Sequence, residues 1–383
     1  MAVYLDNAAT SFPKPEQVYA TVLQTMQQLG GSPGRGGYGL ALNASRVLLE
    51  TREQLARLFH VADSARIVFT PNATVALNYA IQGALQPGDH VVTSSMEHNS
   101  LLRPLFMLEK LGVELTIVPA DAEGLVDPEQ IRLALRPNTR MIAVAHVSNV
   151  TGGLQDIAGI AGIAREAGVL FLLDAAQSAG TLEIDMQALG IDLLAAPGHK
   201  GLLGPQGTGF LAVAPGVALR PILAGGTGSS SDQDTQPDGF PEGFEAGTHN
   251  LPGIAGLGAA LDFLQQHGVA RIGQHEHELA EHARSLLAQL PGCRLYGPQQ
   301  ASRRTAVISC TFDGWDAAAL AFLLDREYGI AVRAGLHCAP RAHRTIGSYP
   351  GGTVRLSPGF FTTLDAIEYT CAALTSITRK GPA

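Results

Sequence analysis

The sequence predicts an α/β protein with a large, mostly parallel seven-stranded sheet and a smaller α+β region toward the C-terminus. From about residue 65, short apolar runs alternate with amphipathic stretches of helical length, which is typical of a sheet covered on both faces. Six of these runs are expected to be parallel strands: 65–69, 90–93, 113–119, 140–146, 169–174 and 192–196. A seventh run, 207–213, follows the sixth too closely for a helical crossover, so we expect it to be antiparallel.

The expected helices separate these strands and continue after them, over residues 73–84, 101–111, 157–167, 251–266, 272–290, 315–327 and 363–378. The stretch 224–250 is rich in Gly, Ser and Asp and is too long for an inert connection. Further strands are expected near 306–312, 331–334 and 353–356. We therefore expect a large domain of residues 15–250, a hinge near Asn250, and a small domain that combines 1–14 with 251–383.

Composition excludes several classes of protein. The 383 residues have a formal net charge of −8, which disfavours a nucleic-acid partner. No uncharged apolar run approaches the ~20 residues of a membrane span, and no secretory signal is visible. Four scattered cysteines without a C-x-x-C pair predict neither a disulfide framework nor a metal site. We expect a cytoplasmic protein that binds neither membrane nor nucleic acid.

Lysine is scarce, and one lysine lies in an unusual place. Only four of the 26 basic residues are lysine, and Lys200 follows the apolar run 192–196 and a Pro-Gly pair. A lysine at the carboxyl end of a strand can be desolvated, which lowers its pKa and frees a neutral amine to form a Schiff base. A surface lysine on a turn is the simpler interpretation. The scarcity of lysine and the flanking glycines favour the functional one.

Asp174 ends another apolar strand, 169–174, at the same expected edge of the sheet. A buried carboxylate needs a cationic or hydrogen-bonding partner. It could be the counter-charge of a protonated ring nitrogen, with Gln177 reaching a neighbouring ring oxygen. An N-cap on the following turn explains Asp174 about as well.

Two further segments offer ligands at this edge. The helix that begins at Ala73 and Thr74 follows a strand directly, so its free N–H groups could bind a phosphate. His98 follows the strand 90–93 and could stack on a ring or move protons. An ordinary capped helix and a solvated loop histidine remain open alternatives.

Cys338 is the cysteine with the most reactive setting. It lies in a turn-like segment near Arg333 and His337, where cationic neighbours favour the thiolate. An incidental free thiol remains an alternative. Arg355, on the expected strand 353–356, is a candidate for bidentate binding of a carboxylate.

Taken together, three of these motifs resemble the class V aminotransferase family: Asp174-Ala-Ala-Gln177, Gly198-His199-Lys200 and Arg333-x-Gly-x-His-Cys338. Within that family they look like the cysteine desulfurase and selenocysteine lyase branch of the type II kind. The resemblance covers nearly the whole chain, including Tyr4–Ala9 and Phe244–Thr248. It implies fold-type I and a homodimer with active sites at its interface.

The resemblance also implies pyridoxal 5′-phosphate as cofactor, with a role for each matching residue. Lys200 would bind the cofactor covalently, Asp174 would pair with the ring nitrogen, and His98 would stack on the ring. The other cofactor contacts implied are Ala73, Thr74, Asn149, Gln177, His199 and, from the second subunit, Thr248. Two positions depart from the family pattern, because Pro197 replaces a phosphate-binding serine and Leu336 replaces a second histidine.

The function implied is conversion of L-cysteine to L-alanine, with Lys200, His98 and Cys338 as catalytic residues. Arg355 and Asn149 would bind the substrate carboxylate, and Cys338 would take the sulfur as a persulfide for delivery to a protein acceptor. A selenocysteine lyase remains an alternative. So does another class V reaction, transamination or epimerisation, in which Cys338 is incidental. A cofactor-binding protein without catalysis is disfavoured by the full set of lysine, aspartate, arginine and cysteine.

Overall fold

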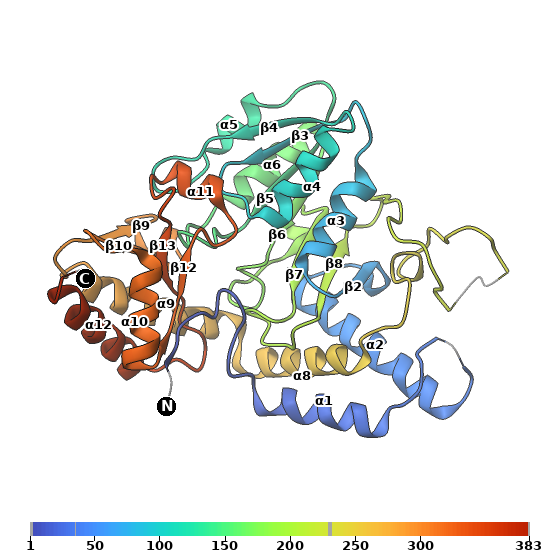
Figure 1. Cartoon of the computed structure of the whole chain (residues 1–383). Helices are drawn as coiled ribbons and strands as arrows, with labels where there is room; N and C mark the ends of the chain where they lie inside the picture. Colours follow the sequence, from blue (N-terminus) through green and yellow to red (C-terminus); the bar gives the residue numbers. More distant parts are fainter. Residues whose placement is uncertain (1–2, 35, 229–231, 382–383) are drawn as a thin grey trace.

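The computed structural model describes residues 3–34, 36–228 and 232–381, and its largest feature is a seven-stranded mixed sheet (Figure 1). The strand order is β2-β8-β7-β6-β5-β3-β4. The strands are β2 (Ile67–Thr70), β3 (His90–Ser94), β4 (Glu114–Val118), β5 (Thr139–Ala145), β6 (Leu170–Asp174), β7 (Leu193–Pro197) and β8 (Gly209–Val213). Strand β8 runs antiparallel to both of its neighbours, β2 and β7, and all other pairs in the sheet are parallel. The predicted strands and the reversed direction of the seventh are confirmed.

Both faces of this sheet are buried, which explains why its central strands are mostly apolar. In β6, Phe171 and Leu173 belong to the core on one face, while Leu172 belongs to the core on the other. Successive side chains of a strand point to opposite faces, so a strand covered twice must be apolar throughout. Asp174 breaks this run where the strand reaches the edge of the sheet.

The helices divide between the two faces. One face is covered by α3 (Ala73–Ala84) and α4 (Asn99–Glu109), and the other by α2 (Gly39–Phe59), α6 (Ile157–Ala167) and α8 (Leu251–His267). Helix α1 (Glu16–Gln28) lies alongside α8 (Figure 1). The short helices α5 (Pro128–Leu133) and α7 (Met186–Leu189) fill connections. No helix among the described residues is long and apolar enough to cross a membrane.

The C-terminal part has its own sheet and core. Its four-stranded sheet has the order β12-β13-β10-β9 and is covered by helices α9, α10 and α12. The elements are α9 (Val269–Leu287), β9 (Cys293–Tyr296), β10 (Ile308–Phe312), α10 (Ala317–Tyr328), β11 (Ile330–Ala331), β12 (Arg333–Gly335), α11 (Pro340–Thr345), β13 (Thr353–Leu356) and α12 (Leu364–Arg379). The strand predicted near 331–334 is therefore two short strands, separated by Val332.

These two short strands belong to different sheets because β11 pairs with β1 (Val3–Tyr4), whereas β12 pairs with β13. The start of the chain thus packs on the small C-terminal part, as predicted. Helix α8 buries Leu257, Leu261 and Leu264 in the core of the seven-stranded sheet. The division into residues 15–250 and the remainder stays a proposal, and α8 joins the two parts.

The long connection 224–250 is anchored by a buried ion pair. The Nη2 atom of Arg52 lies 2.7 and 2.8 Å from the two carboxylate oxygens of Glu245. The same carboxylate accepts the backbone N–H of Phe69 at 2.7 Å, and Arg52 Nε donates to the carbonyl of Ile67 at 2.9 Å. Helix α2, strand β2 and the connection are therefore held together at one point. This contact places the end of the connection beside the strand that leads into α3.

We expect Glu245→Ala to lower the free energy of unfolding by about 3–5 kcal/mol, because it leaves the buried Arg52 guanidinium without its counter-ion. Urea unfolding of the two proteins measures the difference. Glu129→Ala, which removes a partner of Arg132 in an exposed ion pair, is the control and should leave the transition unchanged. A loss for Glu245→Ala no larger than that of the control would contradict the anchoring role.

Candidate active site

One cavity opens at the carboxyl ends of the parallel strands, where ligands gather in sheets of this kind. It is lined by ten of the predicted site residues: Ala73, Thr74, His98, Asn149, Asp174, Gln177, His199, Lys200, Cys338 and Arg355. Thr248 is exposed and does not line this cavity within the single chain. The grouping brings together residues from seven separate segments of the sequence.

The lysine and the aspartate of this cavity influence each other's charge. Burial lowers the pKa of Lys200 to about 8, and the nearby Asp174 carboxylate partly opposes this. Asp174 is 3% exposed, and burial raises its pKa while a hydrogen bond from the Ala176 N–H and the charge of Lys200 lower it. Lys200 follows β7, and Asp174 ends β6, its neighbour in the sheet. A desolvated amine beside a buried carboxylate is suited to covalent chemistry on a carbonyl.

The start of α3 and His199 form one wall of the cavity. Asn72 caps the helix by accepting the Val75 N–H at 3.0 Å, so the first helical N–H groups at Ala73 and Thr74 remain available. The Nδ1 atom of His199 is buried with no hydrogen-bond partner. Such an orphaned atom indicates a missing ligand. A phosphate group fits this wall.

His98 is neutral and rigidly held. It caps α4, with Nδ1 accepting the Ser100 N–H at 3.0 Å. Burial lowers its pKa to about 4, and the positive charges of Lys200, Arg333 and Arg355 contribute. An imidazole that stays uncharged at neutral pH can stack on an aromatic ring without repelling the cations around it.

Sequence reasoning missed Glu97 and underrated His337. Glu97 is 1% exposed and lies close enough to Asp174 that burial and this neighbour raise its pKa to about 8. It accepts hydrogen bonds from Ser94 and from the backbone of Ala145, at the ends of β3 and β5. A carboxylate shortly after the strand β3 is the signal in the sequence.

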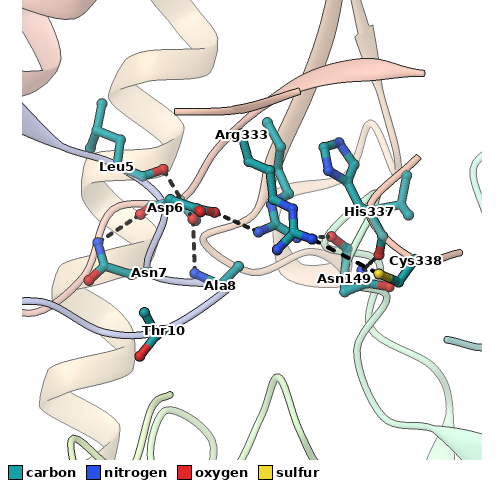
Figure 2. Close-up of polar contacts among 12 residues, drawn as sticks. Leu5, Asp6, Asn7, Ala8, Thr10, Asn149, Arg333, His337 and Cys338 are labelled. Atoms are coloured by element: carbon teal, nitrogen blue, oxygen red, sulfur yellow. Dashed lines mark hydrogen bonds and ion pairs between the residues drawn. The ribbon is translucent and has the colours of Figure 1, made fainter. Parts of the chain in front are cut away.

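Cys338 lies exposed at the mouth of the cavity, on a constrained loop (Figure 2). His337 and Cys338 both adopt positive φ values, 48° and 60°, which non-glycine residues rarely do. The carbonyl of His337 accepts Asn149 Nδ2 at 2.7 Å, and that of Cys338 accepts the Asn99 N–H at 2.8 Å. Arg333 Nη2 lies 4.0 Å from the Cys338 sulfur. The backbone at Cys338 is thus held in place, and the sulfur faces a guanidinium.

Arg355, on β13, lines the same cavity with its positively charged side chain. It is 1% exposed, and its Nη1 donates to the backbone carbonyl of Asn149 at 3.1 Å. Its Nε is buried without a partner, so the guanidinium has unused donors. A carboxylate would satisfy them.

Pyridoxal 5′-phosphate matches what these residues lack. Its phosphate suits the α3 start and the unpartnered His199, its ring nitrogen suits the buried Asp174, and its aldehyde suits Lys200. A seven-stranded mixed sheet with such a lysine and aspartate at its carboxyl edge defines a pyridoxal-phosphate enzyme of fold-type I.

The comparisons identify the family. The model of the family described as "Aminotransferase class-V" matches residues 3–369, so the chain belongs to this pyridoxal-phosphate-dependent family. A probable cysteine desulfurase of Methanothermobacter thermautotrophicus is 38% identical over 99% of this chain and 95% of the relative. One from Vibrio cholerae is 33% identical over 97% and 92%.

Solved structures agree with this assignment. The apo structure of a cysteine desulfurase from Thermococcus onnurineus NA1 has a TM-score of 0.91 at 32% identity, covering 99% of this chain and 95% of that one. The cysteine desulfurase CsdA of Escherichia coli, in an S-sulfonic acid form, has a TM-score of 0.89 at 32% identity with the same coverage. The predicted family, fold-type and cofactor are confirmed. The role of each site residue stays a prediction.

In the cofactor-free protein we expect Lys200 to react with trinitrobenzenesulfonate with an apparent pKa of about 8, below the ordinary value for lysine. Asp174→Asn removes a negative charge that favours the protonated amine, so the midpoint should move to lower pH. Peptide mass mapping follows the modification of each lysine. The exposed Lys110 is the internal control, and its profile should not change. A Lys200 midpoint above 10 would contradict the assignment.

Proposed function

We propose that this protein is a pyridoxal-phosphate-dependent cysteine desulfurase that converts L-cysteine to L-alanine and takes the sulfur on Cys338. One observation supports the proposal above all others: a single cavity contains an amine of lowered pKa, a buried arginine with unused donors and an exposed thiol. The amine is Lys200 and the arginine Arg355. The names of the relatives, probable cysteine desulfurase and cysteine desulfurase, agree with it.

Each residue of the cavity has a separate role in the proposed reaction. Bound in this cavity, pyridoxal 5′-phosphate supplies an electron sink that weakens the bonds at Cα and Cβ of an attached amino acid. Arg355 binds the carboxylate of L-cysteine, and Asn149 fixes Arg355 through its backbone carbonyl. Lys200, whose pKa of about 8 leaves it able to accept and return a proton near neutral pH, moves the proton at Cα. His98 stays neutral against the ring.

The sulfur step needs no outside oxidant or reductant. The Cys338 thiolate attacks the sulfur of L-cysteine, an S–S bond forms, and the Cβ–S bond of the substrate breaks with its electron pair passing to the substrate carbon. Protonation of that carbon completes L-alanine, and Cys338 becomes a persulfide. The guanidinium of Arg333, 4.0 Å from the sulfur, faces Cys338 throughout this step.

The position of Cys338 also favours transfer of the bound sulfur to a protein acceptor. The thiol is exposed, while its loop is held by Asn99 and Asn149. The loop is therefore poorly suited to swing outward, and a protein acceptor must bring its own nucleophile to the mouth of the cavity.

All four cysteines of the chain are free, which agrees with the reducing conditions of the cytoplasm, the location we infer.

A homodimer completes the site in this proposal. Thr248 matches a phosphate ligand of the family yet is exposed here and lies outside the cavity of its own chain. It ends the connection 224–250, which Glu245 anchors against α2. A second copy of the chain that packs on this surface would receive Thr248 at its phosphate wall.

Cys338→Ala should lower alanine release from L-cysteine about 100-fold or more, because the sulfur loses its acceptor while the cofactor pocket stays intact. Alanine is measured under reducing conditions, and the visible absorbance of the bound cofactor confirms loading. Cys293→Ala, which removes a thiol outside the cavity, is the matched control and should retain activity. Alanine release retained by Cys338→Ala would favour a lyase that does not need the thiol. No release from either protein, with cofactor bound, would contradict the desulfurase.

The shared site can be tested by mixing two impaired variants. Lys200→Ala abolishes activity, and Thr248→Ala is expected to weaken cofactor binding about tenfold by removing a phosphate contact. In a mixed dimer, the site with the intact Lys200 receives Thr248 from the Lys200→Ala subunit. Activity should therefore rise above the sum of the separate variants after exchange of subunits. The absence of any rise, with mixed dimers shown by native mass spectrometry, would contradict a shared site.

A further inference from the structure

Asp6, in the N-terminal Tyr4–Ala9 segment, is labelled in Figure 2. It lies against Arg355, the arginine that the proposed function assigns to the substrate carboxylate. Its Oδ1 is 2.7 Å from Arg355 Nη2, and the two residues are 349 positions apart in the chain. The arginine side chain is 2% exposed and that of Asp6 is 22% exposed. Asp6 therefore supplies the counter-charge that this buried guanidinium requires.

Asp6 leaves part of the guanidinium free. A guanidinium has five N–H donors. In this structure Nη2 donates to Asp6 and Nη1 to the carbonyl of Asn149, whereas Nε has no partner. The two contacts fix the plane of the guanidinium from both of its ends. A carboxylate can bind the remaining donors without displacing Asp6.

The backbone around Asp6 is held by the strand that contains Arg355. Ser357, two residues after the arginine, donates its N–H to the Leu5 carbonyl at 2.8 Å, and its Oγ accepts the Ala8 N–H at 2.9 Å. Asn7 Nδ2 donates to the Ser357 carbonyl at 2.9 Å. The position of the Asp6 carboxylate relative to Arg355 is thus set by the backbone and not by the ion pair alone.

The same segment continues to the catalytic lysine. Gln177 Nε2 donates to the Ala8 carbonyl at 3.0 Å. Ser11 donates its N–H to the His199 carbonyl at 2.9 Å and its Oγ to the Lys200 carbonyl at 2.9 Å. Residues 5–11 therefore connect the carboxylate-binding arginine on the small sheet with the lysine on the large one.

We propose that Asp6 is a positioning residue that holds the Arg355 guanidinium in the orientation in which it receives the carboxylate of an α-amino acid. The inference rests on the proposed function for the role of Arg355, and it gives Asp6 no contact with the substrate. The acceptor oxygen of Asp6 sets the orientation of the guanidinium, while its negative charge stabilises the buried cation.

Two substitutions distinguish the effect of the acceptor oxygen from the effect of the negative charge. Asp6→Ala removes the acceptor and should raise KM for L-cysteine about tenfold or more, with kcat within about threefold of wild type, because the guanidinium loses the contact that orients it toward the carboxylate. Asp6→Asn retains an oxygen acceptor and should keep KM within about threefold. Glu281→Ala, which breaks another partly buried ion pair, with Arg304, is the matched control and should leave both constants unchanged. An unchanged KM for Asp6→Ala, or no recovery in Asp6→Asn, would overturn the proposal.

A binding measurement distinguishes a misplaced Arg355 from general damage to the active site, and it does not depend on turnover. L-alanine and ethylamine differ in the carboxylate, and both are titrated into the cofactor-loaded proteins while the visible absorbance is followed. Asp6→Ala should weaken L-alanine about tenfold and leave ethylamine unchanged. Equal weakening of both ligands would overturn the positioning role. Selective weakening in a protein whose wild type releases no alanine from L-cysteine would support the role of Asp6 and overturn the desulfurase.

Discussion

The burial of Lys200 at the carboxyl edge of the sheet is the constraint from which the other properties of the site follow. Its amine must stay desolvated to have a pKa of about 8, and Asp174 is the carboxylate close enough to oppose its loss of charge. Arg333 and Arg355 add positive charge to the same space, and together with burial they lower the pKa of His98 to about 4. The imidazole therefore adds no further charge. What remains is an excess of positive charge that two anions, a phosphate and a substrate carboxylate, can balance.

In the proposed function those anions bind on different parts of the fold, so the chemistry requires these two parts to keep fixed positions relative to each other. The phosphate wall belongs to α3 and the large sheet, while the carboxylate site belongs to β13 and the small one. Residues 5–11 form hydrogen bonds with both, at Ser357 and at His199. A segment near the N-terminus, which is often poorly ordered in other domains, is here a structural part of the site.

The sequence was sufficient to predict the parts of the site that depend on local order. Asp174 and Lys200 each follow an apolar strand, and parallel strands bring their carboxyl ends to one edge, so their proximity could be derived. The Asp6–Arg355 pair could not be, because no local pattern links two residues 349 positions apart. The split of residues 331–334 into two strands was equally hidden, since a single residue, Val332, separates partners that come from different sheets.

Asn149 connects the loop of Cys338, which takes the sulfur in the proposed reaction, with Arg355, which binds the substrate carboxylate in it. Its side chain holds the carbonyl of His337, and its backbone carbonyl holds Arg355. Two adjacent non-glycine residues with positive φ are costly, roughly 1–2 kcal/mol each, so the loop of Cys338 needs such contacts to keep its shape. The residue that stabilises this strained backbone also orients the arginine. The loop that carries Cys338 and the guanidinium of Arg355 are therefore joined through one residue, in addition to the contact of that guanidinium with Asp6.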